Sequence, residues 1–366
     1  MATSQPAAKK RATEAVPDAS ELVSFEHGAA GHQGISSNAS GSLLIKPCVQ
    51  AEIDFYESAK EHPLFQAHMP TFIGSLMQND DEAESAETGA STNASAGPVV
   101  TDPTPGLIKR ATWKPSGGKK LSTGLAIVLE NTTHGFKHPN VLDVKLGARL
   151  WDDAAPGAKR KTLDDVAAST TSGSLGFRVA GMKVHLDGNG GDATEAPEPN
   201  VEIKNGAKSY NKHYGRTFDK DSVVDAFTTY LGGVTRNEAS GGKVEFKKRH
   251  GALIAKRMIR ELESIQYVLE NQESRMYSAS VLWVYEGDDE ALEAGLKAEE
   301  EGDGKEEEDE EGDDHDDDDD EVVTQKVLEA RLIDFAHAKW TPGEGPDENA
   351  LHGIRSQIQI LKGLVG

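Results

Sequence analysis

Apolar positions along this chain gather into short segments whose spacing predicts strands and helices. Residues 125–129 form a continuous apolar run followed by turn residues, which is typical of a buried strand. In residues 251–271 the apolar side chains instead recur every three or four positions, which predicts an amphipathic helix. The same two patterns predict strands at 43–46, 141–146, 176–185, 280–285 and 328–334, and helices at 51–60, 221–231 and 347–364.

Polar stretches separate these segments and divide the chain. Residues 1–24 are predicted to be a disordered tail, and 80–101 and 187–200 to be loops, because they are rich in small, polar and acidic residues. Strands and one helix come first, and a mixed, mostly helical half follows. We therefore expect an α+β fold of two lobes, with the functional site in the cleft between them.

The negative charge of the protein is concentrated in one segment. The whole chain has 62 acidic against 39 basic residues, a net charge of −23, yet residues 288–321 alone hold 22 acids and two lysines. Because it has almost nothing apolar to bury, this segment is predicted to be disordered. A solvated loop is the simplest interpretation, and the alternatives are a decoy surface for basic partners such as histones or an internal competitor for a basic site. The segment lacks the glycine turn and distal glutamate of a calcium-binding EF-hand loop.

The remaining composition excludes several classes of protein. A single cysteine, Cys48, excludes a disulfide framework and a cysteine-rich zinc site, and is typical of a reducing intracellular compartment. No apolar run approaches the roughly 18 residues of a membrane span, and residues 1–15 lack a secretory signal. We expect a soluble monomer that binds no nucleic acid directly. The basic cluster at 9–11 is a weak nuclear-import signal, so the nucleus and the cytoplasm are both expected locations.

The first candidate for chemistry is the segment 139–147. If it is a strand, its alternation places Asp143 and Lys145 on the same face, so that one carboxylate and one ammonium converge on a shared point. Such a pair can accept a hydroxyl proton and neutralise charge on a transferring phosphoryl group. By spacing alone, a surface ion pair is the simpler interpretation.

Two further segments carry residues suited to the same chemistry. Asp334 stands at the end of an apolar strand and precedes Phe335, as does the aspartate that binds Mg²⁺ between nucleotide phosphates in kinases. A buried helix-capping aspartate is the alternative. Lys46 in a strand is followed by Glu52 in a helix, and in kinases such an ion pair orients the lysine onto the α- and β-phosphates. Each signal is weak when it is taken alone.

Taken together, the order of these segments resembles the inositol polyphosphate kinase family, and most of all its fungal multikinases. The central resemblance is the PxxxDxKxG signature at Pro139, Asp143, Lys145 and Gly147, with IDFAH downstream at 333–337. An acidic insertion shortly before IDFAH also resembles the fungal members. Further matching segments are 170–178, 181–183, 214–216, 278–282, 284–287, 341–343 and 347–349.

The resemblance implies a kinase-like fold, related to ATP-grasp enzymes and protein kinases, with an N-lobe at 25–132 and a C-lobe at 133–366. It also implies the use of ATP and Mg²⁺. The hinge would be 129–132, where the backbone at Glu130 and Thr132 would bind adenine. Lys46 would contact the α- and β-phosphates. Asp143 would bind the ribose or the reacting hydroxyl, and Asp334 the Mg²⁺. The glycine-rich turn at Gly28, Gly31 and Gly34 lacks the GxGxxG spacing, so no nucleotide contact is assigned to it.

The resemblance also implies an inositol phosphate substrate. Lys145 and His337 would hold its phosphates, with Lys145 close to the transferred group. A short helical insert at about 152–171 would complete the site, with positive charge from Lys159, Arg160 and Lys161. A highly anionic substrate needs several cations, although a solvated basic face is the simpler interpretation of this cluster.

The function that these features predict is stepwise phosphorylation of inositol 1,4,5-trisphosphate to the tetrakis- and pentakisphosphate. The short insert favours a site that accepts several ring positions. A hexakisphosphate kinase and a strict trisphosphate 3-kinase are the enzymatic alternatives. A nuclear transcription scaffold, whose acidic segment binds transcription factors or basic nuclear proteins, is the alternative of a different class.

Overall fold

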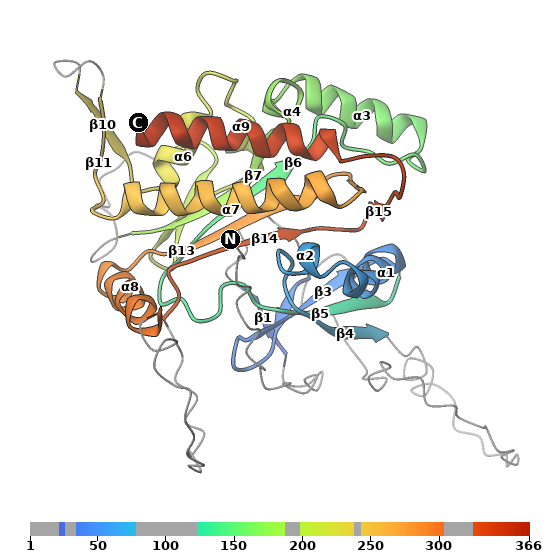
Figure 1. Ribbon diagram of the computed structural model, residues 1–366, viewed down its shortest axis with the longest axis horizontal. Helices are drawn as coiled ribbons and strands as arrows, with labels where there is room; N and C mark the ends of the chain where they lie inside the picture. The colour runs from blue at the N-terminus through green and yellow to red at the C-terminus, as the bar shows by residue number, and fades with distance from the viewer. Residues whose placement is uncertain (1–21, 26–33, 78–122, 187–197, 238–242, 304–324) are drawn as a thin grey trace, which may run out of the picture.

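The computed structural model describes residues 22–25, 34–77, 123–186, 198–237, 243–303 and 325–366. These residues form two lobes, each built around an antiparallel sheet, so the expected α+β fold is confirmed (Figure 1). Among them, no helix is long and apolar enough to span a membrane. The predictions for residues 1–21 of the tail, the loop at 80–101, residues 187–197, Gly28 and Gly31 lie outside the described residues. The prediction that the tail is disordered to residue 24 is wrong at its end, because Val23–Ser24 forms a short strand, β1, by pairing with Ser36–Ser37.

The N-lobe sheet has the strand order β1-β2-β3-β5-β4. The central strand β5 (Leu125–Glu130) pairs with β3 (Leu43–Cys48) on one side and β4 (Phe72–Met77) on the other. Ile127 packs with the helical side of the lobe, whereas Val128 belongs to a cluster on the opposite face. Both faces of β5 are therefore covered, which explains its continuous apolar run. The other elements of the lobe are β1 (Val23–Ser24), β2 (Ser36–Ser37), α1 (Gln50–Ser58), η2 (Ala59–Glu61) and α2 (Pro63–Gln66).

The C-lobe sheet has the strand order β14-β13-β6-β7-β9-β8. Strand β6 (Pro139–Leu146) lies between β13 (Ser280–Glu286) and β7 (Phe177–His185) and is antiparallel to both. Residues 131–138 join β5 of the N-lobe to β6, so this segment links the two lobes. The outer strands of the sheet are β14 (Leu328–Ile333), β9 (Ala207–Tyr210) and β8 (Val201–Lys204).

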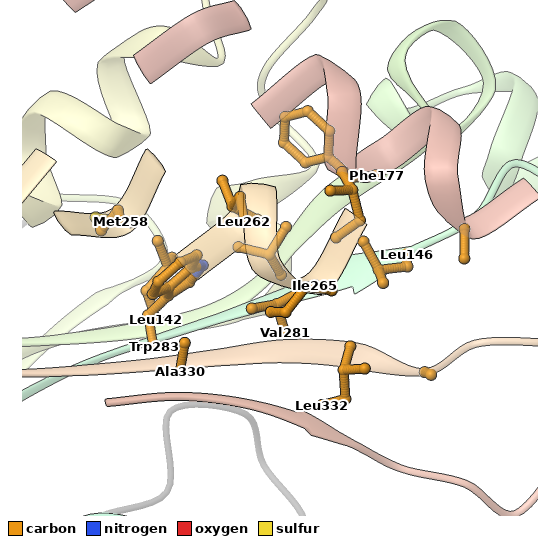
Figure 2. Packing of buried hydrophobic residues seen from close by; sticks show 14 of the residues in the cluster. Leu142, Leu146, Phe177, Met258, Leu262, Ile265, Val281, Trp283, Ala330 and Leu332 are labelled. Atoms are coloured by element: carbon orange, nitrogen blue, oxygen red, sulfur yellow. The ribbon is translucent and has the colours of Figure 1, made fainter. Parts of the chain in front are cut away.

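One face of the C-lobe sheet is buried under two long helices, α7 (Gly251–Asn271) and α9 (Glu348–Val365) (Figure 1). Figure 2 shows Leu262 of α7 close to the strand residues Leu142 and Trp283, all fully buried. Each such side chain contributes about 1.5–3 kcal/mol through burial. Alternation along β6 sends its remaining side chains to the opposite face, toward the N-lobe.

Aromatic side chains join the two lobes. Phe335, which follows β14, stacks on Phe55 of α1 with ring centroids 4.8 Å apart, and Phe55 in turn stacks on Trp340 at 4.7 Å. Trp340 belongs to β15 (Ala338–Trp340), which pairs with β12 (Ser274–Met276). This contact fixes the end of β14 against helix α1.

Most predicted elements are found with their ends shifted by a few residues, and the helix at 251–271 matches without a shift. The prediction missed short elements whose stability comes from tertiary pairing, such as β4 and β12. Other elements that pattern alone did not resolve are α3 (Gly157–Ala168), α4 (Thr171–Leu175), α5 (Lys212–Gly215), β10 (Val234–Asn237) and β11 (Lys243–Phe246), while the predicted helix at 221–231 is α6 (Val224–Tyr230).

The prediction that the whole acidic segment is disordered is wrong for its first half, which forms α8 (Asp289–Asp303). Asp288 caps this helix, because its Oδ1 accepts a hydrogen bond from Ala291 N at 2.9 Å. Leu292 is buried, and Arg257 of α7 pairs with Glu299 at 2.7 Å. A few apolar residues at helical spacing and basic partners on α7 thus outweigh the acidic composition. The remainder of the predicted segment lies outside the described residues.

Candidate active site

A cleft of about 740 Å³, open to solvent, lies between the two lobes. Apolar side chains line it from both lobes: Leu44 and Leu129 from the N-lobe sheet, and Val141, Leu282 and Ile333 from the C-lobe sheet. The arrangement forms a slot that suits a flat, apolar ring.

The segment that links the lobes forms one wall of this cleft, at Glu130–Thr133. The backbone N–H groups of Glu130 and Asn131 donate to Thr71 O at 2.9 Å and Ser42 O at 2.7 Å. The Asn131 side chain bonds to Gly41 O at 2.6 Å and accepts from Thr133 N at 3.0 Å. These bonds fix the backbone of the predicted hinge beside the cleft.

Lys46 of β3 lies in the cleft between two carboxylates. Its Nζ is 2.8 Å from Glu52 Oε1 and 2.6 Å from Asp334 Oδ1. Burial alone would lower the pKa of Lys46, but the negative charges of Asp334 and Glu52 more than offset this and raise it above its ordinary value. The lysine is therefore charged at every physiological pH, and the predicted Lys46–Glu52 contact is present.

Two residues beside Lys145 adopt left-handed backbone conformations. Asp334 has φ 68° and Ser278 has φ 61°, a region that costs a non-glycine residue about 1 kcal/mol or more. The Nζ of Lys145 donates to Ser278 O at 2.8 Å and lies 3.9 Å from Asp334 Oδ2. Asp334 precedes a turn and β15, so the helix-capping interpretation is wrong.

The register of β6 places Asp143 and Lys145 on the cleft side of the sheet, as predicted. Lys145 pairs with Arg178 of β7, and residues that pair directly across antiparallel strands share a face. Arg178 donates to Ser172 Oγ at 2.9 Å, and burial, with the positive charge of Arg216, lowers its pKa to about 10. Arg178 belongs to a segment that the sequence singled out, but the pairing that brings it beside Lys145 has no local sequence signal.

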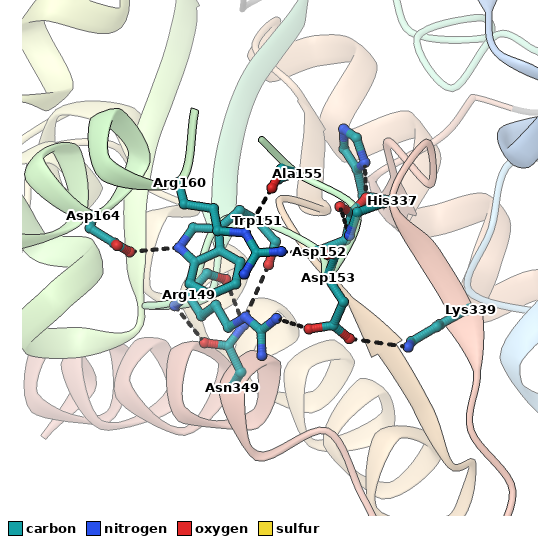
Figure 3. A network of polar contacts seen from close by, with 11 residues as sticks. Arg149, Trp151, Asp152, Asp153, Ala155, Arg160, Asp164, His337, Lys339 and Asn349 are labelled. Carbon is teal, nitrogen blue, oxygen red and sulfur yellow. Dashed lines mark hydrogen bonds and ion pairs between the residues drawn. The ribbon is translucent and has the colours of Figure 1, made fainter. Parts of the chain in front are cut away.

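His337 is held by the segment that follows β6 (Figure 3). Its Nδ1 lies 2.5 Å from Asp152 Oδ2. Burial would raise the pKa of Asp152, but the hydrogen bond and charge of His337 more than offset this and lower it. The adjacent Asp153 pairs with Arg149 and, at 3.5 Å, with Lys339. Asp152 thus fixes the His337 ring, and the adjacent Asp153 binds two cations.

The predicted basic cluster of Lys159, Arg160 and Lys161 lies on the insert, away from the residues around Lys46. Arg160 lies over the Trp151 ring at 4.6 Å and donates to Ala155 O at 2.7 Å, so its guanidinium holds the preceding loop. Lys161 is exposed and pairs with Asp165 of the same helix at 2.8 Å. Lys159 is exposed as well. The fold brings neither lysine into contact with the residues around Lys46.

The glycine of the signature has a structural cause. Gly147 has φ +94°, and a Cβ there would lie 2.5 Å from Asn349 Nδ2. Asn349 of α9 accepts hydrogen bonds from Ala148 N at 2.9 Å and Arg149 N at 2.8 Å (Figure 3). The close approach of this side chain sets the turn that carries the chain from β6 to Asp152.

The carboxylates suit a metal ion that arrives with a nucleotide. Among the described residues, no group of three or more His, Cys, Asp or Glu side chains could hold a metal by itself. Asp334 and Asp143 nevertheless both line the cleft. Mg²⁺ commonly binds through one or two carboxylates together with substrate phosphates. The residues therefore fit a divalent ion of that kind.

A strand lysine held by a helix glutamate, a strand-end aspartate and an apolar slot between two lobes define a phosphotransferase of the kinase type. The family model described as inositol polyphosphate kinase matches residues 126–362. The chain belongs to the inositol polyphosphate kinase family.

Two relatives and one solved structure show how far the similarity extends. The inositol polyphosphate multikinase of Saccharomyces cerevisiae is 31% identical over 92% of this chain and 97% of its own length. The inositol polyphosphate multikinase of Schizosaccharomyces pombe is 27% identical over 93% of this chain and 97% of its own length. A crystal structure of the S. cerevisiae inositol phosphate multikinase, in complex with ADP and Mn²⁺, superposes with a TM-score of 0.60 and 27% identity, covering 89% of this chain and all of that one.

Proposed function

We propose that this protein is an ATP-dependent inositol polyphosphate multikinase, which phosphorylates inositol 1,4,5-trisphosphate stepwise to the tetrakis- and pentakisphosphate. The observation that carries the proposal is the position of Lys46 between Glu52 and Asp334, with Lys145 3.9 Å from the same aspartate. The names of two relatives that match nearly the whole chain support the multikinase activity.

The apolar slot would hold the adenine ring of ATP. The backbone carbonyl of Glu130 and the N–H of Thr132 would bind the ring edge, while Leu129 and Leu282 would cover its faces. Lys46 would then contact the α- and β-phosphates, with Glu52 keeping its side chain in place. The ADP in the related crystal structure supports a nucleotide in this cleft.

Asp334 would hold Mg²⁺, and the Mn²⁺ of the related structure supports a divalent ion. When bound, such an ion neutralises the charge of the phosphate oxygens during transfer. The left-handed backbone of Asp334 directs its carboxylate to Lys46, so the aspartate already occupies the charged end of the cleft. Asp143, on the same side of the sheet, would bind either the ribose or the reacting hydroxyl.

Cations on the other side of Lys145 would hold the inositol phosphate. Lys145 would lie close to the transferred group, and Arg178 beside it would add positive charge. Asp152 fixes Nδ1 of His337 and leaves Nε2 to contact a substrate phosphate. The helix that carries Lys159, Arg160 and Lys161 would supply further charge at the outer edge, where the two lysines are exposed.

Product analysis tests the proposal directly. Purified protein is incubated with Mg²⁺-ATP and, in separate reactions, with inositol 1,4,5-trisphosphate or inositol hexakisphosphate, and the products are separated by phosphate number and position. Sequential tetrakis- and pentakisphosphate is the expected result. A single tetrakisphosphate would instead identify a strict 3-kinase, and turnover of hexakisphosphate alone a hexakisphosphate kinase. A folded sample that transfers no phosphate to any of these would overturn the proposal.

The scaffold alternative receives less support from the described residues. Helix α8 forms the first half of the acidic segment, and its Glu293 and Glu299 pair with Arg249 and Arg257 of the same chain. These carboxylates already have basic partners inside the molecule. A basic nuclear partner, residence in the nucleus and cytoplasm, and a monomeric state stay predictions.

A further inference from the structure

Glu286, the last residue of β13, is a buried carboxylate with four hydrogen-bond donors around it. Its Oε2 accepts from Lys137 N at 2.7 Å and Gln325 Nε2 at 2.7 Å. Its Oε1 accepts from His138 N at 2.9 Å and Asp288 N at 2.9 Å. Only 1% of the residue is exposed. A buried carboxylate is stable when its oxygens are satisfied in this way, and such charge-assisted bonds are about twice as strong as neutral ones.

The four donors come from three separate segments. Lys137 and His138 end the link between the lobes, which begins at the hinge. Asp288 caps the acidic helix α8, and Gln325 opens the segment that leads into β14. One side chain therefore joins the lobe link to the chain on both sides of the acidic insertion.

The residue after Glu286 brings the same segments together. Gly287 N donates to His138 O at 2.9 Å, and a Cβ on Gly287 would lie 2.8 Å from both His138 O and Asn140 Nδ2. Because real Cβ atoms essentially never come this close to other heavy atoms, any larger residue would displace the lobe link. The Glu286–Gly287 pair is thus fitted to one position of that link.

The contacts continue along the link to the wall of the cleft. Lys326 N donates to Gly135 O at 3.4 Å, and its ammonium lies 5.9 Å from the centre of the Phe136 ring. The same ammonium is 3.9 Å from Glu130 Oε1, in the hinge itself. The segment that returns from the acidic insertion therefore follows the hinge segment from Phe136 back to Glu130.

We propose that Glu286 is a positioning residue for nucleotide binding, which holds the hinge segment 130–138 in place and couples it to the two ends of the acidic insertion. The proposal rests on the proposed nucleotide site at Glu130 and Thr132. Residues 131–138 contain no helix or strand, so their conformation depends on a small number of hydrogen bonds. Without the carboxylate, the backbone N–H groups of Lys137 and His138 lose their acceptor, and nucleotide binding must order the segment again.

The proposal predicts different effects on the binding of the two substrates, the nucleotide and the inositol phosphate. Glu286 of β13 pairs with Pro139 at the start of β6, whereas Lys145 lies near the opposite end of β6. At about 3.3 Å per residue, these positions are about 20 Å apart. A change at Glu286 should therefore weaken the binding of nucleotide and leave that of the inositol phosphate unchanged.

The test is a Glu286→Gln variant, assayed by calorimetric titration with Mg²⁺-ADP and by the KM values for ATP and inositol 1,4,5-trisphosphate. An amide retains one acceptor oxygen and turns an NH₂ group toward backbone donors. We expect about tenfold weaker ADP binding, with the KM for ATP raised and the KM for the trisphosphate unchanged. The matched control is Glu299→Gln on α8, which removes the pair with Arg257 of α7 and leaves the contacts of the lobe link in place. This variant should bind ADP as the wild type does.

A milder variant keeps the test valid if Glu286→Gln does not fold. Gln325→Ala removes one donor and leaves the three backbone bonds to Glu286, and we expect about two- to threefold weaker ADP binding. Unchanged ADP binding in the folded variants, even with a lower melting temperature, would show that Glu286 has only a structural role and would overturn the proposal. A wild-type protein that binds no ADP would overturn the proposed function itself, and this inference with it.

Discussion

Lys46 and Asp334 stand 288 residues apart in the sequence and form an ion pair of 2.6 Å across the two lobes. Glu52 holds the lysine from the N-lobe side at 2.8 Å, and Phe335, which follows the aspartate, packs on Phe55 of the helix that carries Glu52. The same helix therefore sets both partners of the pair. This geometry holds one cation and one carboxylate together in the cleft.

The first prediction concerns the carboxylate of this pair. Asp334→Asn keeps the size of the side chain but removes the charge proposed to hold the metal ion. We expect kcat to fall by about 10²-fold or more, a loss similar to that caused by removing a group that stabilises the transition state. The measurement is steady-state transfer from ATP to inositol 1,4,5-trisphosphate, with circular dichroism to establish that the variant is folded. Near-normal turnover would remove Asp334 from the metal site.

The second prediction concerns Glu52, the other carboxylate that contacts Lys46. In Glu52→Gln, Lys46 keeps its contact with Asp334 but loses the partner that orients it from the N-lobe side. We expect the KM for ATP to rise by about fivefold to tenfold, a loss of about 1 kcal/mol or slightly more. The KM for the trisphosphate should change little, because Glu52 lies on the nucleotide side of the cleft.

Gln50→Ala is the control for this second variant, because Gln50 lies on the same helix and its side chain donates to the exposed Asp54. It should leave both KM values unchanged. Equal increases in the two KM values of Glu52→Gln would instead indicate a general disturbance of the lobes, and would count against the assigned role of Glu52.

The sequence predicted those parts of the site that depend on local spacing. Strand alternation was sufficient to place Asp143 and Lys145 on one side of the sheet, because secondary structure determines the relative position of residues two apart in a strand. The analogy with kinases predicted the pair of Lys46 and Glu52, which is present.

The remaining parts of the site depend on tertiary structure. The pairing of Arg178 with Lys145 depends on the register of two strands, and the contact of Glu286 with the lobe link depends on three segments that are distant in sequence. Composition alone predicted disorder where the structure has helix α8. That helix is stabilised by burial of Leu292 and by the ion pair between Glu299 and Arg257, and both depend on tertiary structure. Local patterns contain no information about such partners.

The third prediction is a pH dependence of stability caused by His68. This residue is 9% exposed, and burial, together with the charge of Arg331, lowers its pKa from 6.5 to about 4. Below pH 6.5 His68 binds a proton in the unfolded chain but stays neutral in the folded protein until about pH 4. The free energy of unfolding therefore decreases as pH falls from about 6.5 to about 4. At pH 4.5 the loss due to this group should be about 2–3 kcal/mol.

Urea unfolding at pH 7 and pH 4.5 measures this loss. Other groups also titrate between these values, so the informative quantity is the difference between wild type and His68→Gln. The variant should lose about 2–3 kcal/mol less than the wild type over this range. Equal losses in the two proteins would show that His68 is protonated in the folded state as readily as in the unfolded chain.

The last prediction concerns the pair of Asp152 and His337. Asp152→Asn weakens the contact that fixes Nδ1 of His337, 2.5 Å away, and frees the ring to rotate. If Nε2 of His337 holds a substrate phosphate, the KM for inositol 1,4,5-trisphosphate should rise by about threefold to tenfold while the KM for ATP stays constant. The matched control is Asp221→Asn, an exposed carboxylate paired with Lys220 at 2.9 Å, which should change neither value. Kinetic constants of Asp152→Asn that equal those of the control would exclude His337 from substrate binding, because a free ring cannot hold a phosphate as firmly as a fixed one.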